Sequence, residues 1–298
     1  MSREARLEEI GLHLVGAGGK RIRPLVTVLG FHAAAGGLGT ARRDDAIEVA
    51  VALELIHSAT LLHDDIIDGS ELRRGRASAL QAFGLADTLV AGDFLFCRAF
   101  ALCARFEAQV IRWAAEACVA LTEGEMLQAR FRRNPAVTLG DYHEIVDRKT
   151  AVLFATGART AAYLAGADGT TVELLERAGH HLGMAFQMQD DLLDVDGSLA
   201  ATGKPLGLDL RDGNPSLPIV LGIAADPELR ALFALPAPNP AQIDDAIRRL
   251  RAAGVLETVR EKVARELADG MAALAALPPS DASRALVALA QALATRAG

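Results

Sequence analysis

The sequence has few aromatic residues and no long basic segment, and both shortages bear on function. Aromatic side chains make up 4% of the 298 residues, and tryptophan occurs once. The formal net charge is −7, and the basic residues are concentrated in a few short stretches. Proteins that bind nucleic acids usually present a basic face with aromatic platforms. We therefore expect no nucleic-acid partner.

Cysteines and long apolar runs are also scarce. Cys97, Cys103 and Cys118 lack CxxC spacing, which favours buried free thiols over a disulfide or a zinc site and fits a reducing cytoplasm. No run of about 18 uncharged apolar residues occurs, and the first nine residues are charged where a signal peptide would be apolar. We predict a cytoplasmic protein without a transmembrane segment.

The period-two alternation typical of strands is missing too, whereas apolar residues recur at helical spacing. The pattern predicts an all-α protein. With 51% hydrophobic residues the chain can bury a large core, and we treat 1–298 as a single domain. We expect helices over residues 3–15, from Pro24 onward, and over 46–63, 77–106, 107–133, 138–164, 172–189, 217–224, 241–252, 255–276 and 282–295.

An acidic cluster, Asp64-Asp65-Ile66-Ile67-Asp68, ends the expected helix over 46–63. Asp64 and Asp68 are four residues apart and share a face of that helix. The last turn of a helix favours cations, so three carboxylates there indicate a missing positive charge. Carboxylates without His or Cys suit Mg²⁺, with Mn²⁺ or Ca²⁺ as alternatives. A solvated acidic helix end without a bound metal would have the same sequence pattern.

A second copy of this cluster, Asp190-Asp191-Leu192-Leu193-Asp194, ends the expected helix over 172–189. Two helices with the same cluster at the same end can face each other across a cavity. Bound Mg²⁺ usually keeps waters and takes one or two carboxylates plus substrate phosphates. The pair therefore predicts a diphosphate ligand that is held through metal from both sides.

Basic residues stand close to Gly-rich backbone at two places. Lys20-Arg21-Ile22-Arg23 follows Gly16-Ala17-Gly18-Gly19, and Arg73-Arg74-Gly75 follows the first cluster. Gly-rich backbone before a helix can approach an anion closely, which makes a phosphate site at 16–23 plausible. The segment lacks the spacing of a nucleotide-binding P-loop.

In combination these motifs resemble the trans-isoprenyl diphosphate synthases, most closely their medium- and long-chain members, from geranylgeranyl to octaprenyl type. The resemblance covers roughly residues 18–218. It consists, in order, of GGKRIRP at 18–24, ELIHSATLLHDDIID at 54–68, RRG at 73–75, GDFLF at 92–96, EGEMLQ at 123–128, KT at 149–150, FQMQDDLLD at 186–194 and GKPLGLDL at 203–210.

The resemblance implies a single helical bundle around a deep central cavity, usually a homodimer. It implies an enzyme that condenses isopentenyl diphosphate with an allylic diphosphate, head to tail, into an all-trans polyprenyl diphosphate. About three Mg²⁺ ions per active site, or Mn²⁺, would assist departure of diphosphate. The metal ligands would be Asp64, Asp65, Asp68, Asp190, Asp191 and Asp194.

The remaining site residues also follow from the resemblance. Arg73, Lys149 and Lys204 match positions at the allylic diphosphate. Lys20, Arg23, His57 and Arg74 match the isopentenyl diphosphate site, although His57 could also be a core histidine. Thr150 and Gln187 match positions beside the reacting carbons.

This sequence departs from the family pattern at two places. Asn214 stands where a lysine is common, so binding of phosphate would be weaker. Only 17 residues precede GGKRIRP, so part of the first helices would be missing or rearranged.

Small residues before the first cluster predict a long product. Ala59 lies about 7.5 Å and Ile56 about 12 Å from Asp64 along the helix. Ala59 and Thr60 replace the bulky aromatics of short-product members, so we expect a product of C20 or longer. Trp113 lies about 18 Å before Glu125 on its helix. It would be the floor of the tunnel, or else a core or dimer-interface aromatic.

Four other functions remain open at this stage. The first is a short-chain, farnesyl-type synthase, and the second is a class I terpene cyclase, which would not need the second diphosphate pocket of Lys20, Arg23 and Arg74. A di-metal carboxylate bundle would use Glu-x-x-His pairs, of which the sequence offers Glu54 with His57. A non-catalytic synthase subunit would usually have lost one acidic cluster, and both are intact here.

Overall fold

The computed structural model describes residues 3–36, 42–197 and 206–294 and confirms the all-α prediction. Its helices are α1 (Ala5–Gly16), α2 (Ile22–Ala34), α3 (Arg43–Ile67), α4 (Ala79–Phe83), α5 (Leu85–Cys103), α6 (Ala108–Phe131), α7 (Leu139–Val146), α8 (Val152–Leu164), α9 (Gly169–Asp196), α11 (Leu208–Asp212), α12 (Leu217–Ala225), α13 (Pro227–Phe233), α14 (Pro240–Ala252), α15 (Val255–Ala275) and α16 (Asp281–Ala294), with a π-helical turn η1 (Asp147–Ala151).

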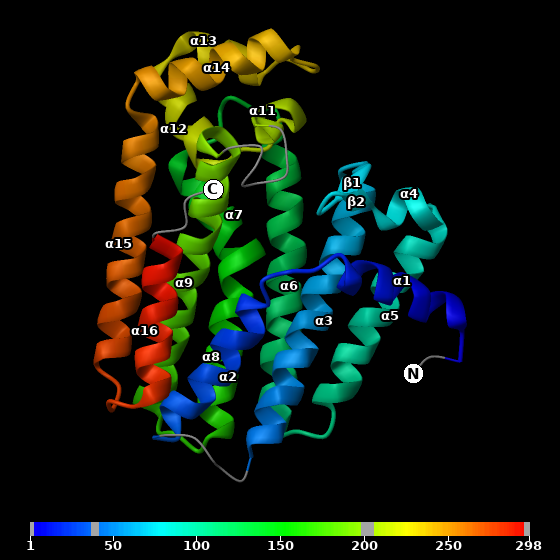
Figure 1. The fold of residues 1–298 in the computed structure, drawn as a ribbon, viewed down its shortest axis with the longest axis vertical. Coiled ribbons are helices and arrows are strands. Elements are labelled where there is room, and N and C mark those ends of the chain that lie inside the picture. Colours follow the sequence, from blue (N-terminus) through cyan, green and yellow to red (C-terminus); the bar gives the residue numbers. More distant parts are fainter. Residues whose placement is uncertain (1–2, 37–41, 198–205, 295–298) are drawn as a thin grey trace.

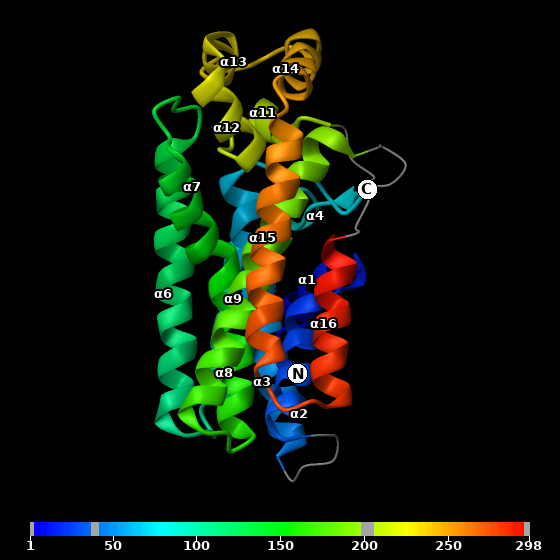
Figure 2. The same cartoon turned by 90° about the vertical axis from the view of Figure 1, so that its left-hand side faces the viewer.

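The helices form a bundle in which α9 is central. It packs against α8 on one side and α15 on another, and α3 packs against α2, α5 and α8. Figures 1 and 2 show that the long helices run roughly along one axis, with α11–α14 gathered at the upper end. The C-terminal ends of α3 and α9 both lie toward that end (Figure 1), so the two acidic clusters come to the same part of the molecule.

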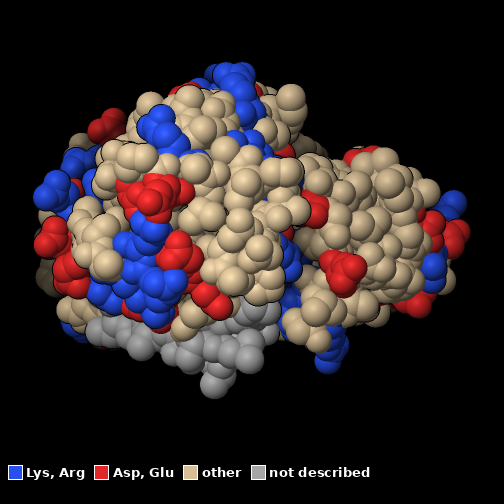
Figure 3. Space-filling model, turned by 90° about the horizontal axis from the view of Figure 1, so that it is seen from above, with Lys and Arg blue, Asp and Glu red and all other residues tan. Residues whose placement is uncertain are grey.

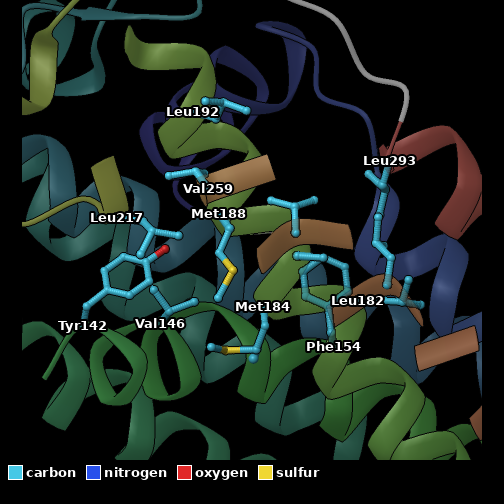
Figure 4. Close-up of a cluster of buried hydrophobic side chains, with 14 of the residues drawn as sticks. Tyr142, Val146, Phe154, Leu182, Met184, Met188, Leu192, Leu217, Val259 and Leu293 are labelled. Atoms are coloured by element: carbon cyan, nitrogen blue, oxygen red, sulfur yellow. The ribbon is translucent and has the colours of Figure 1, made fainter. Parts of the chain in front are cut away.

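The largest apolar cluster surrounds α9. Figure 4 shows Phe154 of α8 beside Leu182, Met184 and Met188 of α9, and the ring of Tyr142 beside Leu217. Helices α8 and α9 approach closely because residue 179 is glycine. A Cβ atom there would lie 2.6 Å from the carbonyl oxygen of Phe154, so any side chain would force the two helices apart.

Helix α3 is the one helix in the described ranges that is long and apolar enough, by length and composition, to cross a membrane. Half of its most apolar window is buried inside the protein. A core helix of a water-soluble protein passes the same test, so this finding alone does not indicate a membrane span.

Several predicted helices are interrupted in the structure. The segment 77–106 divides at Gly84, whose φ is +82°, into α4 and α5. The segment 138–164 divides into α7, η1 and α8, and α13 was not predicted. Strands β1 (Leu72–Arg73) and β2 (Arg76–Ala77) form an antiparallel hairpin just after the first cluster.

Candidate active site

A cavity of about 1660 Å³ opens at the C-terminal ends of α3 and α9. Both acidic clusters contribute to its wall, together with the loop before α2, the β1–β2 hairpin, α6, η1 and the segment around α11. From above, basic and acidic side chains intermingle over this end of the bundle (Figure 3). Of the two clusters, Asp64, Asp68, Asp190, Asp191 and Asp194 line this one cavity.

The first acidic cluster, residues 64–68, is bonded to arginines. Asp65 is fully buried, and its Oδ1 accepts hydrogen bonds from Arg73 Nε and Nη2 at 2.9 and 2.5 Å. The other carboxylate oxygen of Asp65 is buried without a hydrogen-bond partner. Asp68 accepts a bond from Arg132 Nη2 at 2.5 Å. Basic side chains therefore already compensate part of this cluster.

Asp64 lies near Lys149 and Glu125 inside the cavity. Lys149 Nζ forms an ion pair with Glu125 and lies 3.7 Å from Asp64 Oδ1. Burial raises the pKa of Asp64 to about 6, while the charge of Lys149 opposes the shift and those of Glu125 and Asp68 add to it. The ionised form of Asp64 is thus incompletely compensated, and a divalent cation would supply the missing charge.

The π-helical turn η1 brings Lys149 and Thr150 onto the cavity wall. A π-turn adds one residue to a helical turn and often marks a functional site. Here Lys149 reaches the first cluster and Thr150 the second, through Gln187.

In the second acidic cluster, residues 190–194, Asp191 and Asp194 accept hydrogen bonds from uncharged donors of the described residues. Asp191 Oδ2 accepts bonds from Tyr142 Oη at 2.8 Å and from the backbone N–H of Leu217 at 3.0 Å. Its Oδ1 accepts a bond from Gln187 Nε2 at 2.8 Å. Burial raises the pKa of Asp191 to about 6, and these hydrogen bonds oppose the shift. Asp194 accepts the backbone N–H groups of Leu208 and Asp209 at 3.0 and 3.1 Å.

A basic pocket, lined by Lys20, Arg23, His57 and Arg74, forms another part of the same cavity. Arg23 Nη1 donates to His57 Nε2 at 3.3 Å, and the Arg23 guanidinium lies 4.9 Å from the ring centre of Phe154. Burial lowers the pKa of Arg23 to about 10. Burial first, and the charge of Arg23 second, lower the pKa of His57 well below its usual value. His57 is therefore a neutral acceptor.

The proposed di-metal pair of Glu54 and His57 is already engaged by arginines. Glu54 forms an ion pair with Arg21, and His57 accepts from Arg23. Both residues line the basic pocket, so this pair orients cations and does not form an iron site.

The hairpin turn presents Arg74 to the same pocket. Arg74 has φ +53° and Gly75 has φ +77°, the backbone of a type I′ turn. Such a turn twists with its strands, and Gly75 adopts it without a steric penalty. Arg73 and Arg74 consequently point to different partners: Arg73 to Asp65, and Arg74 to the loop before α2, where it bonds to the carbonyl of Gly18.

Most of the predicted site residues line this one cavity. They are Lys20, Arg23, His57, Thr60, Asp64, Asp68, Arg73, Arg74, Lys149, Thr150, Gln187, Asp190, Asp191 and Asp194. Asp65 lies behind the wall and reaches it through Arg73. Lys204 lies outside the described residues.

The predicted chain-length residues occupy different depths. Thr60 lines the cavity, whereas Ala59 and Ile56 are buried behind it. The lining on α6 includes Leu121 and Thr122, about 12 Å along that helix from Trp113. Trp113 packs edge-on against Tyr163, with ring centres 5.5 Å apart, and beneath the guanidinium of Arg159. Its role as a floor stays a prediction.

Several lining residues were missed from the sequence. They are Tyr142, Phe186, Glu125 and Asp209, and Glu54 was considered only as part of a di-metal pair. Glu54 and Glu125 stand within the motifs ELIHS and EGEMLQ, so the motifs alone could have indicated them. Tyr142 is one of only two tyrosines, but its hydroxyl becomes significant only once α7 is placed beside α9.

The described residues contain no group of three or more His, Cys, Asp or Glu side chains that converges as a metal site. The carboxylates of the two clusters instead belong to two different helices, α3 and α9, and both clusters contribute to the cavity wall. This spread fits Mg²⁺, which is typically held by one or two carboxylates with phosphate oxygens and water completing its shell.

Comparison with known proteins consistently finds polyprenyl synthases. The family model described as polyprenyl synthetase matches residues 4–250. The chain is 36% identical to octaprenyl diphosphate synthase of Escherichia coli, over 95% of this chain and 88% of that protein. It is 35% identical to nonaprenyl diphosphate synthase of Mycobacterium tuberculosis, over 96% and 86%. A Caulobacter crescentus polyprenyl synthase, solved with calcium and isoprenyl diphosphate, superposes with a TM-score of 0.92 at 36% identity, over 100% of this chain and 91% of that one.

The chain therefore belongs to the polyprenyl synthetase family. Its fold is that of the solved polyprenyl synthases.

Proposed function

We propose that this member of the polyprenyl synthetase family condenses isopentenyl diphosphate with an allylic diphosphate to give an all-trans polyprenyl diphosphate of C20 or longer. The observation that carries this proposal is the pairing of two acidic clusters with a separate basic pocket in one cavity. The relatives are named as octaprenyl and nonaprenyl diphosphate synthases, which supports a medium or long product.

Asp64, Asp68 and Asp190 would hold Mg²⁺ with the allylic diphosphate between the clusters, and Asp65, Asp191 and Asp194 were predicted as further ligands. When bound, the metal would neutralise charge that develops on the departing diphosphate. Lys149, Arg73 and Lys204 would add fixed positive charge to the same group. Charges that are preorganised in a dry cavity favour this charge-separated step over the intact ester.

The basic pocket would hold isopentenyl diphosphate without metal. Lys20, Arg23 and Arg74 would bind its phosphates, and neutral His57 would donate through its other nitrogen, because its Nε2 accepts from Arg23. With the two diphosphates on opposite sides, the double bond of one substrate can reach the allylic carbon of the other beside Thr150 and Gln187. The departing diphosphate would accept the final proton.

Analysis of the product by mass spectrometry tests this function. Purified protein with Mg²⁺, isopentenyl diphosphate and farnesyl diphosphate should release polyprenyl diphosphates of C20 or longer. Release of C15 alone, from a shorter primer, would indicate a short-chain synthase. Cyclic hydrocarbon formed without isopentenyl diphosphate would indicate a cyclase, and inactivity of the protein alone would indicate a non-catalytic subunit.

The same assay tests the floor of the tunnel. If the growing chain passes Leu121, Trp113→Ala should lengthen the product. An unchanged length would remove Trp113 from the tunnel. Leu121→Ala is the matched variant, because Leu121 contacts the cavity directly.

The protein would act as a cytoplasmic homodimer. Neighbouring helices α5 and α6 expose large apolar side chains, including Leu89 and Val90 on α5 and Val119 and Met126 on α6, at 43–67% exposure. Burial of such side chains between two copies would be favourable. Sedimentation of the wild type and of a Val119→Asp/Met126→Asp double variant tests this: the variant should be monomeric.

A further inference from the structure

A second cavity, of about 280 Å³, lies between α8, α9 and the start of the π-turn η1. We call it the α8–α9 cavity. In the described part of the chain it shares no lining residue with the active-site cavity. The π-turn nevertheless contributes to both, because Asp147 lines the α8–α9 cavity while Lys149 and Thr150 line the active-site cavity. Pockets for drug-sized ligands span about 300–1,000 Å³, so this cavity suits a small ligand.

Two polar atoms in the wall of the α8–α9 cavity lack a hydrogen-bond partner among the described residues. Thr156 is 2% exposed and its Oγ1 is unpartnered, and so is the buried Nε of Arg159. The two residues are three positions apart on α8 and share a face of that helix. Buried polar groups are nearly always hydrogen-bonded, so these two donors indicate a ligand that accepts from them.

The hydroxyl of Thr156 is available because it does not bond to its own helix. Thr27, Thr88 and Thr122 also lie in helices, and each donates its Oγ1 to the carbonyl four residues earlier, at 2.8–3.0 Å. A helical threonine commonly satisfies its hydroxyl in this way. Thr156 departs from the pattern, and it is the one of the four that lines the α8–α9 cavity.

The carboxylates in this wall are already paired, which leaves a surplus of positive charge. His180 Nε2 donates to Asp147 Oδ1 at 2.8 Å, and Arg159 Nη1 donates to Glu176 Oε1 at 2.8 Å. Arg177 also lines the cavity, is exposed, and forms no ion pair among the described residues. The wall therefore offers an uncompensated guanidinium beside the two unpartnered donors, and this combination favours an anion.

The number of donors points to a phosphate group. Arg177, the Nε of Arg159 and the hydroxyl of Thr156 are three donor groups on two helices. A carboxylate has two acceptor oxygens, whereas a phosphate group has at least three and can accept from all of these donors. Val152 and Ala155 add apolar side chains to the wall, against which a short hydrocarbon could pack.

We propose that the α8–α9 cavity is a second anion site, which binds a small phosphate or diphosphate through Arg177, Arg159 and Thr156 and acts on the reaction through the π-turn. Inorganic diphosphate and isopentenyl diphosphate both carry the required group. A ligand at Asp147 would favour one arrangement of the turn that also holds Lys149. This regulatory effect rests on the proposed function, whereas the binding itself does not.

The chain contains its own reporter for this site. Trp113 is the only tryptophan, and its ring lies 4.8 Å from the guanidinium of Arg159. It lines neither cavity. Arg159 Nη2 also lies 3.6 Å from Glu116 Oε2, so an anion at Arg159 would alter the charges next to the indole. Inorganic diphosphate has no hydrocarbon to enter a tunnel, and a change of fluorescence with this probe would therefore arise from anion binding.

The binding experiment follows Trp113 fluorescence in metal-free protein, with EDTA and at constant ionic strength. The probes are inorganic phosphate, inorganic diphosphate and isopentenyl diphosphate, and the wild type should give a saturable change. Thr156→Val, which replaces the hydroxyl by a methyl group, and Arg177→Gln should each raise the Kd about tenfold, as expected for loss of a hydrogen bond to a charged group. Arg112→Gln is the control: Arg112 is exposed, precedes Trp113 and lines neither cavity, so the Kd should stay unchanged.

The three probes distinguish the possible ligands. Saturation by all three would show that one phosphate group suffices, by diphosphate alone that both phosphates are needed, and by isopentenyl diphosphate alone that the apolar wall contributes. No saturable change with any probe, or an equal Kd in the wild type, Thr156→Val and Arg177→Gln, would overturn the site. Because Arg177 is exposed, its variant keeps the test decisive even if Thr156→Val does not fold.

A kinetic experiment tests the regulatory effect. With both substrates and Mg²⁺ at saturation, competition at the active-site cavity is suppressed, and added inorganic diphosphate should still change the kcat of the wild type about twofold or more. Thr156→Val and Arg177→Gln should lose this change, and an unchanged wild-type kcat would overturn the regulatory role. A protein that gives the fluorescence change but forms no product would refute the proposed function and leave the anion site; product without the fluorescence change would do the reverse.

Discussion

The two acidic clusters share the spacing of their aspartates but are held in different ways. In the first, Asp65 and Asp68 are bonded to Arg73 and Arg132. In the second, Asp191 accepts from a tyrosine, an amide and a backbone N–H. The negative charge of Asp65 or of Asp68 is balanced largely by one arginine. The negative charge of Asp191 is instead stabilised by several uncharged donors together. The same five-residue pattern therefore supports two different local structures.

The sharpest test of their common role removes the cavity-facing carboxylate from each cluster. Asp64→Asn and Asp190→Asn should each lower kcat by about a thousandfold, roughly 4 kcal/mol of transition-state stabilisation, because each would remove a charge that holds metal and diphosphate. Steady-state rates at saturating Mg²⁺ measure this. A loss confined to one cluster would show that only that cluster participates.

A second test compares how much the arginine bonded to Asp65 and the tyrosine bonded to Asp191 each contribute to the free energy of unfolding. Arg73→Met leaves the Asp65 carboxylate buried without a cation and should reduce the free energy of unfolding by about 3 kcal/mol. Tyr142→Phe removes one of several donors and should cost about 1 kcal/mol. Urea unfolding of the metal-free protein measures both. Arg76→Met, at an exposed position of the same hairpin, is the control, and equal losses for Arg73→Met and Tyr142→Phe would remove the distinction.

A third test uses pH. Folding raises the pKa of both Asp64 and Asp191 from 3.8 to about 6, so the folded state binds more protons than the unfolded chain between these values. Their contribution to stability is therefore greatest below about pH 4 and is lost as the pH rises through 6, at up to about 1.4 kcal/mol per pKa unit for each group.

Bound Mg²⁺ should restore part of the stability that is lost as the pH rises. Because protons compete with Mg²⁺ for Asp64, the increase in thermal midpoint that Mg²⁺ and diphosphate produce should grow from pH 5 to pH 7. Asp64→Asn should flatten that growth, whereas Asp191→Asn should remove only the contribution of Asp191 to the pH dependence of the metal-free protein. Scanning calorimetry at several pH values measures both, and a ligand-induced increase that is independent of pH would contradict the expectation.

The smallest expected effect concerns Asn214. Its side-chain oxygen accepts a bond from Gln128 Nε2 at 3.3 Å at the cavity wall near the second cluster. Asn214→Lys would add a cation there and should lower the KM for the allylic diphosphate about threefold to tenfold. Asn214→Gln controls for side-chain length. A KM that rises in the lysine variant would show that the charge acts on the bound metal instead.

Periodicity predicted the long helices because their apolar faces are continuous. Residues 46–63 and 172–189 lie within α3 and α9, and α7 begins with a capping box of Thr138 and Asp141, where the predicted segment 138–164 begins. The breaks were harder to predict. The π-turn at Asp147–Ala151 keeps helical periodicity on both sides, and the split at Gly84 depends on a single residue.

The site residues were predictable where a sequence motif fixes both the residue type and the residues next to it in the sequence. Lys149, Thr150 and Gln187 stand in such motifs, and the structure places all three on one wall. The partners of Asp65 and Asp191 were not predictable, because the two aspartates occupy equivalent positions in identical patterns. Only the packing of α7 and the hairpin against α9 and α3 distinguishes them.

The π-turn limits which insertions and deletions this chain can accept. Removing one residue between Asp147 and Ala151 would let α7 and α8 join as a regular helix, and the local backbone would gain stability. Every side chain before the deletion would then rotate by about 100° relative to those after it. Loops in this protein can accept insertions or deletions, but within this turn the number of residues itself sets which way Lys149 and Thr150 point.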